Sequence, residues 1–259
     1  MLRSIPIYKI YAVKYAGPFL RPLARVLWNK GWEDRIEISY YIWVIQGNGE
    51  TVMVDSGVAP SLAREQQLEG YVNPVHVLAR LGIQASQVKR VILTHAHWDH
   101  ITGIELFPNA TFYLQKKEFD FWMRDPIAKK PPFLMVSHPL VFSSISGLEE
   151  TGRLVLADGD HQYLPGVELL FAPGHTPGLQ AVSVNTARGT AIVGSDCAHI
   201  FRSYEEEIPS CFITDMIAWM ESYDKLKSRV SSLDLLFPGH DMKMSTHYPK
   251  MAEDITQLA

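Results

Sequence analysis

The sequence predicts an α/β fold, because segments with strand character alternate with helix signals and no internal repeat interrupts them. Residues 36–46 are rich in β-branched and aromatic side chains, which is typical of a strand. Asn48-Gly49 is a strong two-residue hairpin turn, and strand character resumes at residues 51–54. Because no linker-like tract divides the chain, we expect residues 1–259 to form one domain.

The next two elements follow from capping and burial signals. Asn73 is a favourable helix cap and Pro74 a favourable first-turn residue, so a short helix is predicted there, ending at Gly82. Residues 88–94 then form an apolar run that predicts a buried strand.

The second half of the chain repeats this alternation. Four further strands are expected, at residues 153–157, 167–172, 180–185 and 190–194. A helix is predicted from Thr214, with a largely apolar stripe. The stripe consists of Met216, Met220, Tyr223, Lys227 and Val230. Residues 233–237 predict a last short strand, and a terminal helix is expected from about Thr246.

Two segments, residues 14–35 and 123–150, show no clear periodicity. Long irregular segments within a domain serve as lids, substrate loops or partner surfaces, although surface packing is an equal alternative. The first segment is rich in aromatic residues, so we expect it to form a hydrophobic lid or a homodimer contact.

The composition excludes several classes of protein. The chain has 259 residues, with 24 basic and 28 acidic side chains, and its net charge of −4 leaves too little basic charge for a nucleic-acid-binding surface. Hydrophobic residues make up 47% of the chain, which excludes disorder as its main state. No apolar run approaches the roughly 20 residues of a membrane helix, so no membrane partner is expected.

Two features predict a cytoplasmic protein. No apolar signal core follows the first basic residue, so we expect no export. Cys197 and Cys211 are too few for a disulfide framework and indicate a reducing compartment, where both would serve packing.

The most informative stretch, Thr94-His-Ala-His-Trp-Asp-His100, directly follows a predicted buried strand. Neutral imidazoles and a carboxylate that converge at a strand end suit a borderline metal such as zinc. The candidate ligands of this motif are His95, His97, Asp99 and His100. Four ligand-type side chains within six positions make a surface turn without metal a poor alternative.

Three further candidates, His175, Asp196 and His240, also follow apolar runs. Strand ends at one edge of a layered sheet lie close in space even when they are distant in sequence. Together with the first motif, these residues supply five histidines and two aspartates, enough for two metal ions.

The pattern H-x-H-x-D-H, followed by G-H-T-P-G, a strand-end aspartate and a late P-G-H, resembles the metallo-β-lactamase-fold superfamily over nearly the whole chain. The resemblance implies a four-layer αβ/βα sandwich with a dinuclear metal site at one edge of its sheets. It implies that His95, His97 and His175 hold the first metal. It implies that Asp99, His100 and His240 hold the second, with Asp196 bridging.

Within that superfamily, the VMVDSG and LPGVELLFAPGHTPG stretches most resemble the lactonases that open N-acyl homoserine lactones or 4-pyridoxolactone. Asp196 stands where true β-lactamases tend to have a cysteine, which argues against antibiotic hydrolysis. The lactonases typically have a substrate-contacting tyrosine where this chain has His199. Tyr40, Tyr41 and Tyr204 are alternative sources of a phenol.

These observations predict a metal-dependent hydrolase that opens a lactone. Two divalent ions, zinc by default with iron or manganese as alternatives, would share a hydroxide that attacks the ester carbonyl. Asp99 or His199 would deliver the proton to the leaving oxygen. Arg202 and Tyr204 are expected to contact the small-molecule substrate, and Asp55 is expected to orient the ligand imidazoles by hydrogen bonding.

Three alternatives stay open at this point. The same site would also serve a cyclic-amide or a thioester hydrolase, because the fold fixes the hydrolytic site more firmly than the bond cleaved. The third alternative is a non-catalytic metal-binding module, which the presence of all seven candidate ligands disfavours.

Overall fold

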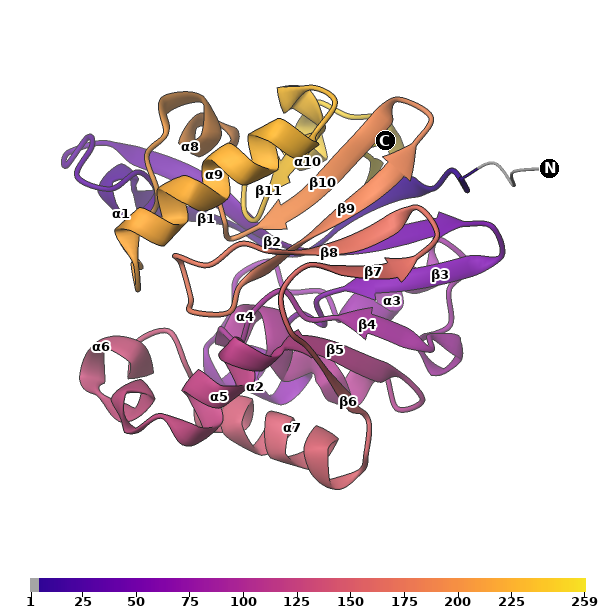
Figure 1. The fold of residues 1–259 in the computed structure, drawn as a ribbon, viewed down its shortest axis with the longest axis horizontal. Coiled ribbons are helices and arrows are strands. Elements are labelled where there is room, and N and C mark those ends of the chain that lie inside the picture. The colour runs from indigo at the N-terminus through magenta and orange to yellow at the C-terminus, as the bar shows by residue number, and fades with distance from the viewer. Residues whose placement is uncertain (1–4) are drawn as a thin grey trace.

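A computed structural model describes residues 5–259, which form two β-sheets packed face to face with helices outside them (Figure 1). The first sheet has the strand order β12 (Lys250–Ala252), β13 (Ile255–Gln257), β1 (Lys9–Pro22), β2 (Arg35–Gly47), β3 (Glu50–Val54), β4 (Arg90–Ile92), β5 (Thr111–Gln115) and β6 (Leu154–Ala157). The second has the order β11 (Leu236–Pro238), β10 (Gly189–Ser195), β9 (Gln180–Thr186), β8 (Val167–Phe171) and β7 (His161–Leu164).

The helices form the two outer layers. Those associated with the first sheet are α1 (Leu23–Val26), α2 (Pro60–Glu65), α3 (Pro74–Ala79), α4 (Trp98–Ile101), α5 (Lys116–Arg124), α6 (Pro131–Leu134) and α7 (Pro139–Glu150). Those that contact the second sheet are α8 (Phe201–Glu206) and α9 (Met216–Arg229), and α10 (Lys243–Thr246) follows β11 in the chain. Short 3₁₀ turns complete the chain at η1 (Ala85–Gln87), η2 (Thr102–Leu106), η3 (Pro126–Lys129) and η4 (Leu233–Leu235). This order of layers confirms the predicted four-layer αβ/βα sandwich (Figure 1).

Three buried clusters hold the layers together. The cluster between the sheets includes Trp43, Val182 and Phe237, all fully buried. A second cluster fills the space between the first sheet and its helices, and a third lies between the second sheet and α9. Burying large apolar side chains stabilises the fold by roughly 1.5–3 kcal/mol each. The sandwich therefore presents its strand ends as a rigid edge.

Several predicted elements occur where the sequence placed them. The Asn48-Gly49 turn joins β2 to β3, and both residues have positive φ, as a two-residue hairpin of this kind requires. The Asn73 side chain caps α3 by accepting a hydrogen bond from the backbone N–H of Val75 at 3.0 Å. Gly82 takes a φ of 72° just beyond that helix.

The prediction that residues 14–35 are irregular is wrong. Most of the segment belongs to β1, which pairs with β2 through two register shifts, and to the short helix α1. The second shift, between Ala16 and Phe19, accommodates Gly17 and Pro18. Tyr15 and Phe19 are core residues, whereas Trp28 and Trp32 are exposed.

The second segment, residues 123–150, is also ordered. It contains the end of α5, η3, α6 and the whole of α7, whose first turn is capped by the His138 side chain. Prolines at the starts of η3, α6 and α7 explain why no long periodic pattern is visible in the sequence.

Two predictions for the C-terminal third need correction. Of the predicted stripe of α9, Tyr223 is buried and Met220 and Val230 pack against the same cluster, but the other buried residues are Trp219, Ser222 and Leu226, which lie outside the stripe. The predicted terminal helix from Thr246 is instead the β12–β13 hairpin, which extends the first sheet beside β1. Strands β5 and β7 were not foreseen.

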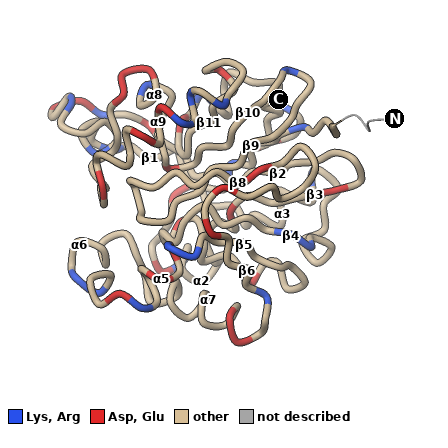
Figure 2. The backbone as a smooth tube through the Cα atoms, in the orientation of Figure 1, with Lys and Arg blue, Asp and Glu red and all other residues tan. Residues whose placement is uncertain are grey.

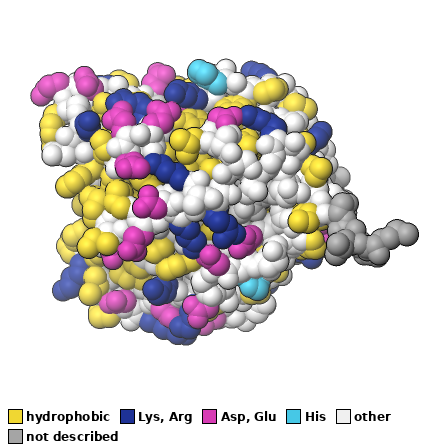
Figure 3. All heavy atoms as spheres, turned by 45° about the horizontal axis from the view of Figure 1, so that its top comes forward, with side chains coloured by type: hydrophobic (Ala, Val, Ile, Leu, Met, Phe, Trp, Pro, Cys, Tyr) yellow, Lys and Arg dark blue, Asp and Glu magenta, His cyan; other side chains and the backbone are white. Residues whose placement is uncertain are grey.

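No helix in the described part of the chain, residues 5–259, is long and apolar enough to span a membrane. Figure 2 shows basic and acidic residues interspersed along the backbone. Figure 3 shows hydrophobic side chains gathered toward the left of the molecule, the side on which Figure 1 places α1 and α6.

Candidate metal centre

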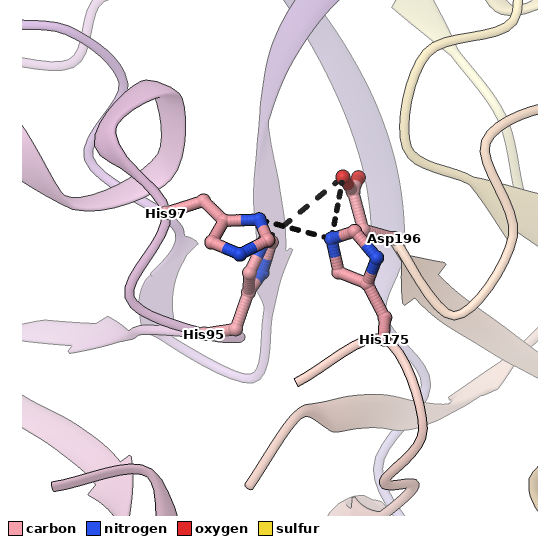
Figure 4. Close-up of side chains that lie close together, drawn as sticks. All are labelled: His95, His97, His175 and Asp196. Carbon is pink, nitrogen blue, oxygen red and sulfur yellow. Dashed lines mark hydrogen bonds and ion pairs between the residues drawn. The ribbon is translucent and has the colours of Figure 1, made fainter. Parts of the chain in front are cut away.

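The first group of candidate ligands comes together from three loops at one edge of the two sheets. His95 and His97 lie between β4 and α4, His175 follows β8, and Asp196 follows β10. One ligand atom from each of the four lies within 4.8 Å of every other. The Nε2 atom of His175 is 3.4 Å from Oδ2 of Asp196 and 3.0 Å from Nδ1 of His97 (Figure 4).

The second group adjoins the first through Asp196. It consists of Asp99 and His100 on α4 and His240 after β11, again with ligand atoms within 4.8 Å of one another. Oδ1 of Asp196 is 3.4 Å from Nε2 of His100 and 3.0 Å from Nε2 of His240. One buried carboxylate therefore faces both groups, as a bridging ligand must.

The donor chemistry fits two divalent metal ions. Among the described residues, Nε2 of His95 and Nε2 of His100 are buried without any hydrogen-bond partner. Such atoms are costly to bury unless something else satisfies them, and a metal ion does so. Imidazole nitrogen and carboxylate oxygen are the donors that zinc, iron and manganese accept.

The protonation states favour the ligand forms of the first group. Burial lowers the pKa of both His95 and His97 well below the usual value for histidine, so their rings are neutral at pH 7. Burial would raise the pKa of Asp196, but the neighbouring His240 and His100 outweigh it and hold that pKa well below its usual range. The carboxylate is thus ionised and ready to bind a cation.

Backbone carbonyls orient two of the imidazoles. Nδ1 of His175 is 3.0 Å from the carbonyl oxygen of Phe212, and Nδ1 of His240 is 3.1 Å from that of Ser39. A carbonyl oxygen can only accept, so each Nδ1 carries the proton and donates it. Each Nε2 consequently faces the centre, which is how metal-binding histidines are usually held.

Asp55 occupies the position predicted for it beneath the motif. Its Oδ2 atom is 2.7 Å from Nδ1 of His100, and its Oδ1 atom accepts a hydrogen bond from the backbone N–H of Thr94 at 2.7 Å. The Thr94 hydroxyl lies 3.0 Å from Nδ1 of His95. The φ angle of Asp55 is 63°, an unusual conformation for a non-glycine residue, which the fold maintains at this turn.

Glu118, at the start of α5, was not foreseen as part of the site. Its carboxylate accepts hydrogen bonds from the backbone N–H groups of Ala96 and Gly178 and from the indole N–H of Trp122. It therefore ties the H-x-H turn to the loop that carries His175. Burial raises the pKa of Glu118, and these N–H donors oppose the rise.

His199 lies inside the site. Its Nε2 atom is 3.5 Å from Oδ2 of Asp196, its ring stacks on Phe212, and its Nδ1 atom has no partner among the described residues. Burial lowers the pKa of His199 well below its usual value, so the ring is neutral. Of the three candidate phenols, Tyr40 lines the cavity, whereas Tyr41 donates to Ser245.

The structure does not bring Arg202 or Tyr204 to the site. Arg202 pairs with Glu206 one turn further along α8, at 2.7 Å, and does not line the cavity. Tyr204 is buried in the cluster between the second sheet and α9, with its ring 5.2 Å from that of Tyr223. Neither position supports the expected contact with substrate.

A cavity of about 580 Å³ opens above the candidate ligands. Its floor includes His97, Asp99, His175, Asp196, His199 and His240. Its walls come from the end of β1, from α1 and from residues 135–138, which belong to the two segments that the sequence analysis singled out as lids or substrate loops. The volume is that of a small-molecule site.

The protein-family model described as Metallo-beta-lactamase superfamily matches residues 36–240 of this sequence. The chain belongs to this superfamily. All seven candidate ligands lie inside the matched range. With their arrangement around a cavity, family membership makes the protein a metal-dependent hydrolase.

The chain is similar to several curated lactonases. It is 23% identical over 225 residues to an N-acyl homoserine lactonase of Bacillus thuringiensis, covering 80% of this chain and 83% of the relative. It is 24% identical over 245 residues to the N-acyl homoserine lactonase AttM of Rhizobium radiobacter, covering 87% and 90%.

Solved structures show the same fold. A quorum-quenching N-acyl homoserine lactone lactonase superposes with a TM-score of 0.77 at 20% identity, covering 95% of this chain and 97% of that one. AidC, described as a dizinc quorum-quenching lactonase, superposes with a TM-score of 0.70 at 17% identity, covering 92% of each chain.

Proposed function

We propose that the protein is a dinuclear metal-dependent lactonase. One observation carries the proposal: two groups of buried ligands share Asp196 at the floor of a cavity large enough for a small lactone. The similarity to N-acyl homoserine lactonases supports the lactone as the substrate class. We propose that both ions are zinc, since AidC is a dizinc enzyme and the donor set suits this metal.

The proposed ligand assignment follows the two groups. His95, His97 and His175 would hold one ion, and Asp99, His100 and His240 the other, with Asp196 shared. When bound, the two ions would supply a hydroxide for attack on the ester carbonyl at neutral pH and polarise that carbonyl.

The chain's own residues would position the substrate and handle the proton. The neutral ring of His199 lines the cavity beside Asp196, so it can donate a hydrogen bond to the substrate carbonyl if its cavity-facing nitrogen carries the proton. Asp99, whose side chain is the more exposed of the two acidic ligands, is placed to deliver a proton to the leaving ring oxygen. The apolar walls around Trp98 and Val136 would limit the access of bulk water.

A substrate screen tests this function. A pH indicator would follow acid release from lactones, cyclic amides and thioesters, with the wild type and His199→Gln measured side by side. We expect hydrolysis of lactones, and a fall in kcat of about 10²–10⁴ in the variant with unchanged metal content, as for loss of a general acid or hydrogen-bond donor. Activity confined to amides or thioesters would overturn the lactonase proposal.

We further propose that the chain folds as one domain and works in a reducing compartment. We also propose that two copies of it form a homodimer. Both cysteines are free in the structure, and Trp28 and Trp32 expose large apolar surfaces near the tip of the β1–β2 hairpin. Light scattering at several protein concentrations tests the dimer. We expect Trp28→Ser with Trp32→Ser to give a monomer, and an unchanged mass for wild type and variant would refute this contact.

A further inference from the structure

Three arginines line the mouth of the cavity, and no step of the proposed lactone hydrolysis requires their positive charge. Arg21 at the end of β1, Arg25 on α1 and Arg35 at the start of β2 all line it. The acidic side chains that line the same cavity are Asp99 and Asp196, both candidate metal ligands. The wall above the centre is therefore cationic.

These three arginines have no acidic partner in residues 5–259 of the structure. Most other arginines do form ion pairs, namely Arg80, Arg90, Arg124, Arg188, Arg202 and Arg229. A guanidinium is always charged and presents a planar fork of N–H donors that matches a carboxylate or a phosphate. Three such groups left unpaired at one opening are available to an anionic ligand.

Aromatic rings hold two of the guanidinium groups in place. Arg21 lies over the ring of Phe19, 4.9 Å from its centroid, and Arg25 lies over the ring of Phe212 at 5.1 Å. Such stacking restricts the side chain. Nη1 of Arg21 also donates to the backbone carbonyl oxygen of Leu20 at 3.3 Å, and the remaining N–H groups of its guanidinium are left for a ligand.

The same rings connect the arginines to the metal centre. Phe212 stacks on His199 with ring centroids 6.4 Å apart. Phe19 packs against Tyr40 at 4.7 Å, and Tyr40 packs against His240 at 5.2 Å. Arg25 is thus linked to the floor of the cavity through one ring, and Arg21 through two.

We propose that the substrate carries an anionic group, a carboxylate or a phosphate, which Arg21 and Arg25 bind while the lactone carbonyl lies over the metal centre. This rests on the proposed lactonase function and narrows its substrate class. A neutral lactone such as an N-acyl homoserine lactone offers these arginines no ionic partner. Arg35 adds positive potential at the mouth and would speed the encounter with an anion.

Matched substrates test the inference. The metal-loaded enzyme would be assayed with γ-butyrolactone γ-carboxylate, with its primary amide, and with the same lactone carrying a phosphate ester on a hydroxymethyl group. The amide keeps the ring and the size of the acid but removes the charge. Comparing kcat/KM for the phosphate ester with kcat/KM for the carboxylate shows which anion the arginines bind better.

The variants are Arg21→Gln, Arg25→Gln and the double variant. Arg229→Gln serves as the control, since Arg229 pairs with Glu168 and does not line the cavity. We expect each single variant to lower kcat/KM for an anionic lactone by about ten- to hundredfold, the usual worth of a hydrogen bond to a charged group. The effect on the amide should stay below about threefold, and the control should match the wild type.

The inference fails if the wild type hydrolyses the amide as well as the anionic lactones, or if the double variant loses both activities equally. Binding of pyroglutamate, a cyclic amide with the same carboxylate, would be measured by calorimetry in parallel. If no lactone is hydrolysed but pyroglutamate binding still depends on Arg21 and Arg25, the lactonase proposal fails and the anion site stands. If binding is also independent of these arginines, both fail.

Discussion

Replacing Glu118 with alanine is expected to destabilise the metal-binding end of the protein. Oε1 of this carboxylate accepts hydrogen bonds from the backbone N–H of Ala96 at 2.9 Å and from the indole N–H of Trp122 at 2.8 Å, and Oε2 accepts one from the backbone N–H of Gly178 at 2.8 Å. All three donors are buried. Removing the carboxylate leaves them without an acceptor.

The cost follows from the number of donors. Each buried N–H without a partner costs about 1–3 kcal/mol, and partial relaxation of the loops gives an expected total of about 3–5 kcal/mol for Glu118→Ala. Glu118→Gln retains a carbonyl oxygen at the Oε1 position, so only the Gly178 N–H loses its acceptor, at a cost of about 1–3 kcal/mol. In a protein of this size, 1 kcal/mol corresponds to about 2–4 °C in Tm, so the alanine variant should melt about 6–20 °C lower.

Urea unfolding of the metal-free protein measures this effect without the added stability that a bound metal gives to the folded state. Glu221→Ala, on the exposed face of α9, is the matched control and should change the free energy of unfolding by less than about 0.5 kcal/mol. A loss below about 1 kcal/mol in Glu118→Ala, or an equal loss in Glu118→Gln, would refute the reasoning.

Three further predictions concern the centre and the core. In Gly239→Ala, the added Cβ would stand 2.0 Å from Oδ1 of Asp196, so we expect metal content measured by atomic emission to fall by at least half; full occupancy would be the contrary result. A thiol reagent should label one cysteine per folded chain and two per chain in denaturant. Cys211 is exposed, whereas burial hides the Cys197 thiol and raises its pKa. Rapid labelling of both cysteines in the folded protein would contradict the packing beneath α9. A chelator should lower Tm by several degrees, since a metal that binds only the folded state stabilises it, and an unchanged Tm would argue against such binding.

The sequence was most informative where structure is decided locally. The Asn48-Gly49 turn and the Asn73 cap depend on neighbouring residues, and both occur as predicted. The candidate ligands could be gathered because each follows a strand, and strand ends of a layered sheet share an edge.

The sequence misled where partners are distant. Because of Gly17 and Pro18, the sequence pattern of β1 predicted an irregular segment. Pairing with β2 and β13 nevertheless keeps this strand in the sheet. The buried face of α9 is set by where Trp219 meets the second sheet, which periodicity alone could not place.

Glu118 could not be singled out for the same reason. In the sequence it is one charged residue in a polar stretch, and only the fold brings the Ala96 and Gly178 loops to its carboxylate. Tyr204 shows the converse error: it follows Asp196 closely in sequence, yet α8 turns it into the core behind the site.

Metal content per chain, measured on the purified wild type and on Asp196→Ala, tests the central claim most directly. Because the Asp196 carboxylate faces both ligand groups, we predict about two divalent ions per wild-type chain and at most one in the variant, with lactone hydrolysis lost. Asp224→Ala, on the exposed face of α9, should keep both ions. A wild type that binds no metal, or an Asp196→Ala variant that retains two ions and full activity, would contradict a shared dinuclear centre.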